Sequence, residues 1–392
     1  MDKTQQLINK GVSLPDPQAV VIGDTVRIDR IAGEGVVLFP GTRIEGSRTF
    51  IAAGARIGAE GPATVENCYV GPDVQLKGGF FSEAVFLSKA ACGLGAHVRQ
   101  GTIMEESAST AHTVGLKQTI LFPFVTLGSL INFCDCLMAG GSSRDNHSEV
   151  GSSYIHFNFT PLQDKATPSL IGDVPKGVML NQSPIFLGGQ GGLVGPCRLA
   201  YGTVTAAGTI CRHDQLAENH LVLGSKTRSG SVAYVPGAVF NLKRILKNNL
   251  IYIGNLFALA QWYARVRAQF VGPAMPPPLL EGLKATVQGA IDERIRQLGR
   301  LGEKLAHREA SDAAAEGFAA RWPHISEQLG ELRQFGGEAD APERFLVVLD
   351  QQITHYGKDY LTVIKHLDPF QAALGTRWLS GIVHKVIDEM EP

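Results

Sequence analysis

Val70-Gly71-Pro72-Asp73-Val74 is one copy of a short phrase that recurs along the N-terminal part of the chain. Two further copies are Ile22-Gly23-Asp24-Thr25-Val26 and Val194-Gly195-Pro196-Cys197-Arg198. A recurrence near every six residues fits three short strands per coil, with the aliphatic side chain inside and glycine at the corner. Stacked coils pair in parallel, so the pattern predicts a three-sided β-helix of roughly nine or ten coils. A glycine-rich β-sandwich is the alternative, but its two-residue alternation is poor here.

The composition of the 392 residues supports a repeat protein and argues against several classes of function. The chain holds 45 glycines and only 7% aromatic residues, which directs attention to repeats. Its formal net charge of -1 gives no strong attraction to nucleic acid. No stretch approaches the ~20 apolar residues of a membrane span, no signal-peptide pattern starts the chain, and six cysteines do not indicate a secreted disulfide framework. We therefore expect a cytoplasmic protein.

The sequence changes character near residue 242. Charged residues become more frequent, and apolar residues such as Leu283, Val287 and Ile291 recur at helical spacing. The expected helices span 242–267, 279–305, 311–332, 342–366 and 369–390. We expect three parts: a linker-like segment 1–20, the β-helix 21–242 and an all-α region 243–392. The helical part either packs or oligomerises, or it gates a partner or substrate, and the sequence leaves both open.

Four motifs resemble one known family. They are residues 185–196 (IFLGGQGGLVGP), residues 206–209 (AAGT), residues 151–159 (GSSYIHFNF) and residues 11–17 (GVSLPDP). Together they resemble the acetyltransferase domain of the bifunctional N-acetylglucosamine-1-phosphate uridyltransferase/glucosamine-1-phosphate acetyltransferase family, over roughly residues 7–230. The resemblance implies a left-handed parallel β-helix of hexapeptide repeats. It also implies acetyl-CoA as co-substrate and a homotrimer with sites between subunits.

The other activity of that family is not expected. The chain starts at the segment that resembles the family's linker, and no Gly-x-Gly-x-x-Gly or Walker-type loop follows an expected strand. We therefore expect no uridyltransferase or pyrophosphorylase activity.

Acetyl transfer to a sugar amine needs a base, a donor for the oxyanion, and cations for the sugar phosphate. Arg99 and Lys117 each follow a coil-like phrase and resemble an Arg and a Lys that the family uses on the phosphate. Lys165 resembles another family lysine. A guanidinium fork and an ammonium suit a phosphate, but solvated surface cations are the alternative for all three.

Five further positions resemble the family's acetyl-donor site. Asn158 matches an asparagine that helps to hold the donor, and its neighbour Phe159 stands where the family has Tyr. Gly189 stands where the family has Ser, so a hydroxyl contact is lost. Ala206 and Ala207 are small, as a close approach of the donor arm requires, although tight coil packing explains them equally well.

The base is the missing part of the pattern. The family uses a His, and counting back from Asn158 reaches Asp135 instead, which needs a raised pKa to serve. His156 lies two residues before Asn158, so on a strand the two share a face, and a neutral imidazole suits a base. A histidine held by core or surface hydrogen bonds is the alternative. His112 lies about two coils too early.

The cysteine pair is not expected to bind a metal. Cys134-x-Cys136, with Asp145 and His147 nearby, does not have the spacing of a standard zinc site. Residues 142–147 are polar and unpatterned, and we expect them to form a loop that leaves the β-helix. We expect no metal.

Two hypotheses remain open. In the first, the chain is an acyl-CoA-dependent acyltransferase acting on an amino sugar or sugar phosphate, which Asn158, Arg99 and Lys117 favour. In the second, it is a non-catalytic relative that binds a sugar nucleotide or serves as a trimeric scaffold, which the missing His and the changes at Phe159 and Gly189 favour. A protein that only assembles with a partner through its helices is a third reading.

Overall fold

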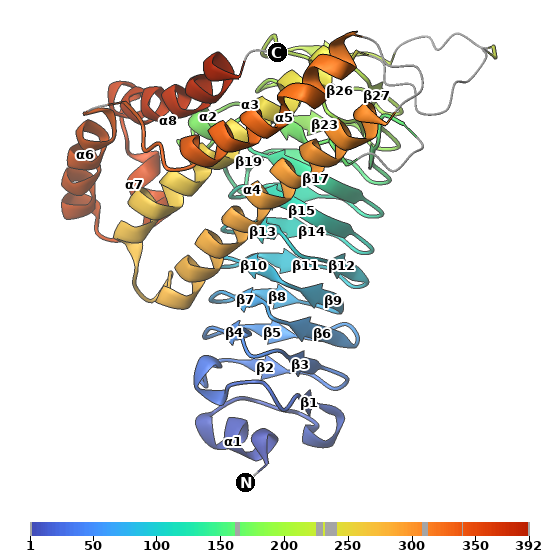
Figure 1. Ribbon diagram of the computed structural model, residues 1–392. Coiled ribbons are helices and arrows are strands. Elements are labelled where there is room, and N and C mark those ends of the chain that lie inside the picture. Colours follow the sequence, from blue (N-terminus) through green and yellow to red (C-terminus); the bar gives the residue numbers. More distant parts are fainter. Residues whose placement is uncertain are drawn as a thin grey trace.

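A parallel β-helix runs through the first part of the chain, as Figure 1 shows. The computed structural model describes residues 2–160, 165–224, 230–231, 241–307, 313–338 and 340–390. Within these residues, one side of the β-helix stacks ten short strands, which agrees with the expected number of coils. The left-handed parallel β-helix with a helical C-terminal region is therefore confirmed. The division into three domains stays a prediction, although the first strand begins at Val21 and the first long helix at Leu242.

The β-helix has three faces. Face 1 consists of β1 (Val21–Ile22), β3 (Arg43–Glu45), β6 (Ala63–Glu66), β9 (Gly79–Ser82), β12 (Ala96–Val98), the first halves of β15 (Gly115–Leu121) and β17 (Asn132–Met138), β21 (Ile155–Phe157), β24 (Gly192–Val194) and β27 (Ile210–Cys211). Face 2 consists of β2 (Val37–Leu38), β5 (Arg56–Ile57), β8 (Gln75–Leu76), β11 (Ala91–Cys92), β14 (Ser109–Thr110), β16 (Thr126–Leu127), β20 (Glu149–Val150), β23 (Phe186–Leu187), β26 (Val204–Thr205) and β28 (Leu221–Val222). Face 3 consists of β4 (Phe50–Ile51), β7 (Tyr69–Val70), β10 (Ala84–Phe86), β13 (Thr102–Met104), the second halves of β15 and β17, β22 (Ser169–Ile171) and β25 (Arg198–Leu199).

Inward side chains of successive coils form the core. On face 1, Val98 pairs with Leu116 and Leu116 with Phe133, and all three are buried. At the corner between faces 1 and 3 the chain turns through left-handed backbone, at Gly101 with φ 76° and at Asp135 with φ 61°. A glycine adopts this conformation without strain, and short polar side chains such as aspartate tolerate it.

The C-terminal helical region lies against face 3. The outward side chains of face 3 include Val85, Ile103, Ile120 and Leu137, and all are at most 1% exposed. α4 (Pro277–Ala306) packs on β7, β10 and β13, and α3 (Leu242–Gln261) packs on β22. The apolar outward column of face 3 is thus a binding surface for the helical region, which identifies packing as one of its roles.

Most of the other helices extend that layer, whereas the N-terminal helix packs on β1 at the opposite end of the β-helix (Figure 1). α3 continues through a π-helical turn (Trp262–Val266) and a 3-10 turn (Arg267–Phe270). The remaining helices are α1 (Lys3–Lys10), α2 (Val174–Gly177), α5 (Ala313–Leu332), α6 (Ala341–Tyr356), α7 (Tyr360–Lys365) and α8 (Pro369–Glu389). The expected helix 342–366 is two helices, because the chain turns at Gly357 with φ 81°. No helix among the described residues is long and apolar enough to span a bilayer.

Candidate functional site at a corner of the β-helix

Two of the expected phosphate-binding cations lie on neighbouring coils. Val98 pairs with Leu116, and Lys117 pairs with Cys134, so Arg99, Lys117 and Cys134 occupy successive outward positions at the edge of face 1. Neighbouring coils are about 4.8 Å apart. Arg99 and Lys117 are half-buried, and within the described chain the buried Nε of Arg99 has no hydrogen-bond partner. This pair therefore places two cations on neighbouring coils at the outer edge of face 1.

The third expected cation belongs to the same patch. Burial raises the pKa of the Cys134 thiol, and Asp135 raises it further, whereas Arg99, Lys117 and Lys165 oppose this shift through their charges. Lys165 is exposed, and its backbone oxygen accepts a hydrogen bond of 3.1 Å from Arg294. Arg99, Lys117 and Lys165 are therefore near enough to Cys134 for their charges to act on its thiol.

Asp135 lies at the same corner but is not free. It is 6% exposed, and its Oδ1 is 2.8 Å from a guanidinium nitrogen of Arg294 on α4. Burial raises the pKa of Asp135 above its ordinary value, although the charge of Arg294 works against this shift. A raised pKa suits a base, but the Asp135 carboxylate is paired with Arg294 on α4, a helix that the family resemblance does not include. A catalytic role for Asp135 stays a prediction.

His156 points into the β-helix. It pairs with the buried Leu193, it is 8% exposed, and its Nε2 lies 2.8 Å from Ser169 Oγ. Burial, aided by the charge of Arg294, lowers the pKa of His156 to about 4. The expectation that His156 shares a face with Asn158 is wrong: β21 ends at Phe157, and Asn158 is exposed whereas His156 is inside. The imidazole is therefore a buried group that is hydrogen-bonded inside the β-helix.

The expected donor-site residues are spread over two corners. Asn158 is exposed directly after β21, and Phe159 packs partly against the core. Gly189, Ala206 and Ala207 lie at the opposite edge of face 1, where face 2 turns into it, on two adjacent coils. A Cβ on Gly189 would lie 2.9 Å from Ser152 O, so close backbone packing explains why a serine is absent there.

The two groups of site residues do not meet within one chain. The coil that contains Lys117 is followed by those of Cys134, Phe157 and Val194 before the chain reaches Ala206 and Ala207. At about 4.8 Å per coil, the cations and the small residues lie several coils apart along the axis. A single subunit therefore does not assemble all the expected residues into one pocket.

The cysteine pair does not converge. Cys134 is half-buried on the outside of face 1, whereas Cys136 is buried inside, beyond the corner at Asp135. Over the described ranges, no three His, Cys, Asp or Glu side chains gather as metal ligands. Residues 142–147 do leave the β-helix, as expected, in a hairpin of β18 (Gly141–Ser143) and β19 (Asn146–His147).

Two functional candidates were missed from the sequence. His97 is exposed on β12, two residues before Arg99 and on the same outward side. Its ring stacks on Phe80 with centroids 5.2 Å apart, and the next coil offers only Gly115 above it. Arg294 stands within the apolar stripe of α4, and a charged residue at such a position is a signal for a buried ion pair.

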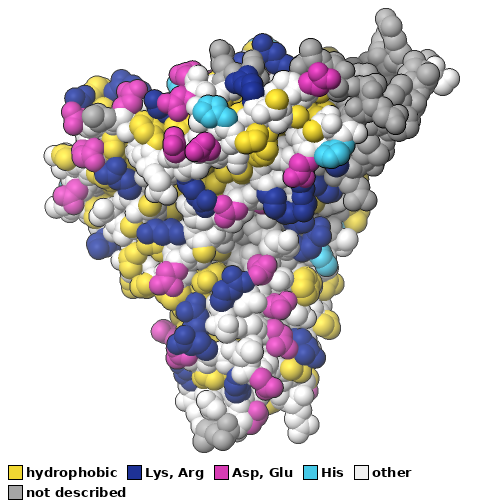
Figure 2. Space-filling view, viewed as in Figure 1, with side chains coloured by type: hydrophobic (Ala, Val, Ile, Leu, Met, Phe, Trp, Pro, Cys, Tyr) yellow, Lys and Arg dark blue, Asp and Glu magenta, His cyan; other side chains and the backbone are white. Residues whose placement is uncertain are grey.

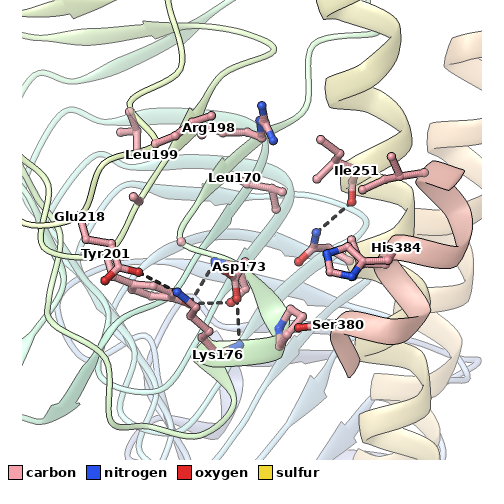
Figure 3. A pocket seen from close by; sticks show the side chains of 17 residues that line it. Leu170, Asp173, Lys176, Arg198, Leu199, Tyr201, Glu218, Ile251, Ser380 and His384 are labelled. Atoms are coloured by element: carbon pink, nitrogen blue, oxygen red, sulfur yellow. Dashed lines mark hydrogen bonds and ion pairs between the residues drawn. The ribbon is translucent and has the colours of Figure 1, made fainter. Parts of the chain in front are cut away.

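A separate pocket lies near the end of the β-helix that carries the last coils. Figure 3 shows Lys176, Glu218 and Tyr201 directed toward one another across it. The cavity measures about 290 Å³ and reaches α8 at His384. Lys176 Nζ is 2.7 Å from Glu218, so these charges neutralise each other. None of the residues expected from the sequence lines this pocket.

The chain is similar to curated proteins named bifunctional protein GlmU. It is 26% identical to that of Thermotoga petrophila over 215 residues, which is 55% of this chain and 42% of GlmU. It is 26% identical to that of Clavibacter sepedonicus over 204 residues, which is 52% of this chain and 36% of GlmU. The chain spans less than half the length of these relatives. No family model matches.

The solved structures that resemble this chain do so only weakly. The polysialic acid O-acetyltransferase OatWY shares 9% identity at a TM-score of 0.16, over 59% of this chain and 92% of its own. A likeness this low carries no argument about function. The similarity to GlmU agrees with the family resemblance of the motifs.

Proposed function

We propose that this protein is an acyltransferase that moves an acyl group from acetyl-CoA to an amino sugar phosphate. The observation that carries the proposal is the pair Arg99 and Lys117 on adjacent coils, joined by Lys165. Arginine can grip two phosphate oxygens, and lysine adds a point charge. The similarity to GlmU supports the same class of reaction, with glucosamine-1-phosphate as the first acceptor to test.

The proposed reaction assigns a role to His97. The sugar amine attacks the thioester carbonyl, a C–N bond forms, the C–S bond breaks, and the departing CoA thiolate takes up the proton that the amine has lost. A base must take the proton of the attacking amine. His97 is exposed on the outward side that carries Arg99, whereas His156 is buried inside. The donor residues lie several coils away, so we propose a homotrimer in which a neighbouring subunit supplies the donor side.

The test measures CoA thiol release from acetyl-CoA with glucosamine-1-phosphate. Removing the base is expected to lower kcat by about 10²–10⁴-fold, so His97→Gln should do so, while His112→Gln, at an exposed imidazole of a corner, should not. Arg99→Ala with Lys117→Ala should mainly raise KM. Absence of acetyl-CoA-dependent thiol release with any amino sugar phosphate would end the proposal.

A specific observation favours a second candidate, a non-catalytic ligand-binding relative. Both bases expected from the sequence are occupied, His156 by burial and Asp135 by Arg294. Calorimetric titration separates the candidates, because binding of acetyl-CoA or a UDP-sugar without turnover supports this one.

A further inference from the structure

A groove of about 270 Å³ lies between α4 and the corner where faces 1 and 3 meet. The corner contributes Asn67, Gln100 and Gln118 to one wall, and α4 contributes Thr286, Gly289 and Glu293 to the other. Figure 2 views the molecule from the side on which α4 crosses the β-helix, and acidic and basic side chains alternate there without a face of one sign. The groove exists only because the helical region covers face 3.

The corner wall is a ladder of polar side chains. Asn67, Glu83 and Gln118 all have left-handed backbone, with φ of 50°, 50° and 49°, so each sits at the turn of its coil. The coils rise in steps of about 4.8 Å. A sugar ring has similar dimensions, so consecutive rungs can contact consecutive parts of one ring or of two linked rings.

Gln118 supplies an acceptor without a partner. The residue is 9% exposed, and its Oε1 is buried and makes no hydrogen bond among the described residues. Leaving a buried polar atom unpaired is unfavourable. The atom belongs to a residue that lines the groove, and a bound hydroxyl group would satisfy it.

The charges of the groove cancel. Arg48 pairs with Glu83. Glu293 pairs with Arg296 and accepts a hydrogen bond of 2.7 Å from Gln297. The side-chain polar groups that remain are the neutral amides and the hydroxyl groups of Tyr69 and Thr286. A phosphate or CoA needs uncompensated cations, and an acyl chain needs apolar walls, so this groove suits neither. Neutral hydroxyl groups, which both donate and accept, match amides.

Gly289 keeps the groove open. It lies in the middle of α4, and a Cβ built there meets no atom within 4 Å. Glycine destabilises a helix interior relative to alanine, and no packing contact requires it here. The missing side chain leaves room opposite the amides of the corner.

We propose that this groove binds a neutral carbohydrate of one or two sugar rings. The site goes beyond the proposed acyl transfer, because neither Arg99 nor Lys117 lines it. It would hold a saccharide against the corner ladder while the edge of face 1 stays available to a sugar phosphate.

The experiment measures binding of N-acetylglucosamine, its β-1,4-linked dimer and maltose to the full chain by saturation-transfer NMR and calorimetry. Gly289→Trp should fill the groove and weaken binding by about tenfold or more. Gly289→Ala and Gly330→Trp, the latter at an open, exposed position of α5, are matched controls and should change affinity less than about twofold. Circular dichroism and the thermal midpoint check the fold of each variant.

Gln118→Met gives an independent readout. It keeps the shape of the side chain but removes an oxygen that has no partner, so stability should not fall while sugar affinity does. The proposal is overturned if none of the three sugars binds, or if both Gly289→Trp and Gln118→Met bind like the wild type. Loss of binding in Arg99→Ala with Lys117→Ala alone would also overturn it, because the sugar would then occupy face 1. Failure of thiol release with sugar binding intact would affect only the acyltransfer proposal.

Discussion

Faces 1 and 3 of the β-helix are built by the same repeat, but the outward side chains of face 3 are largely buried and those of face 1 are largely exposed. On face 3 the outward residues Ile120 and Leu137 are buried, at 1% and 0% exposure, on the side that the helical region covers. On face 1, the outward residues His97 and Asn132 are exposed. The strands β15 and β17 contribute to both faces. The comparison shows that the outward side chains, and not the glycine-aliphatic phrase, decide which face of a β-helix is covered.

The covered face also carries buried charge. Arg294 of α4 meets Asp135 of the corner, and Arg267, after α3, meets Glu106 at another corner. Both arginines are nearly fully buried. Buried pairs of this kind add little net stability, but removing one partner is costly. We infer that these two ion pairs fix the position of the helices along face 3.

The largest expected change in the free energy of unfolding is at Arg294, and it tests whether the helices cover face 3 through buried ion pairs. Arg294→Met should leave Asp135 buried without its partner and lower the free energy of unfolding by about 3–5 kcal/mol. Urea unfolding measures it. The double variant Arg294→Met with Asp135→Asn should recover most of the loss, since no unpaired charge remains. A cost below about 1 kcal/mol for Arg294→Met, as for an exposed pair, would contradict a buried role.

A comparison within one strand tests the two faces directly. Leu137→Ala removes a fully buried outward side chain from the covered face 3 and should cost about 2–5 kcal/mol of unfolding free energy. Asn132→Ala lies on the same strand, β17, but on the exposed side, and should stay within about 0.5 kcal/mol of the wild type. Equal costs in chemical denaturation would mean that face 3 is not covered in solution.

The smallest expected effect is the loss of stability at low pH that His156 causes. The pKa of His156 is lowered to about 4 in the folded chain, below the ordinary value of about 6.5 expected on unfolding. The unfolded chain therefore binds the extra proton first, and stability is lost as pH falls from about 6.5 toward 4. Between pH 7 and pH 5 the wild type should lose about 2 kcal/mol more than His156→Leu.

The difference in pH-dependent stability between the wild type and His156→Leu isolates the contribution of His156. Burial raises the pKa of Glu105 to about 7, so the folded chain holds this proton more tightly, and stability falls as pH rises from the ordinary value toward 7. That opposite trend is common to both proteins and cancels. Parallel pH profiles would show that His156 is not buried as a neutral imidazole.

The repeat could be predicted from the sequence because its signal is local. Glycine and an aliphatic residue recur within each coil, and the helical stripes of α4 and α8 are equally local. The pairing of Asp135 with Arg294 could not be predicted, since the partners are far apart in sequence and meet only when α4 docks. His156 was misplaced because the family motif does not show which strand positions point inward, and His97 lay outside that motif.

The helices that cover face 3 limit how copies of this chain can associate. Because one of the three faces of the β-helix is occupied by its own helices, two faces are left for contact with neighbouring copies. A closed three-fold ring needs two contact surfaces on each copy. Any such ring would run its seams along faces 1 and 2, and the Arg99–Lys117 edge would border a seam, with the helices on the outer rim.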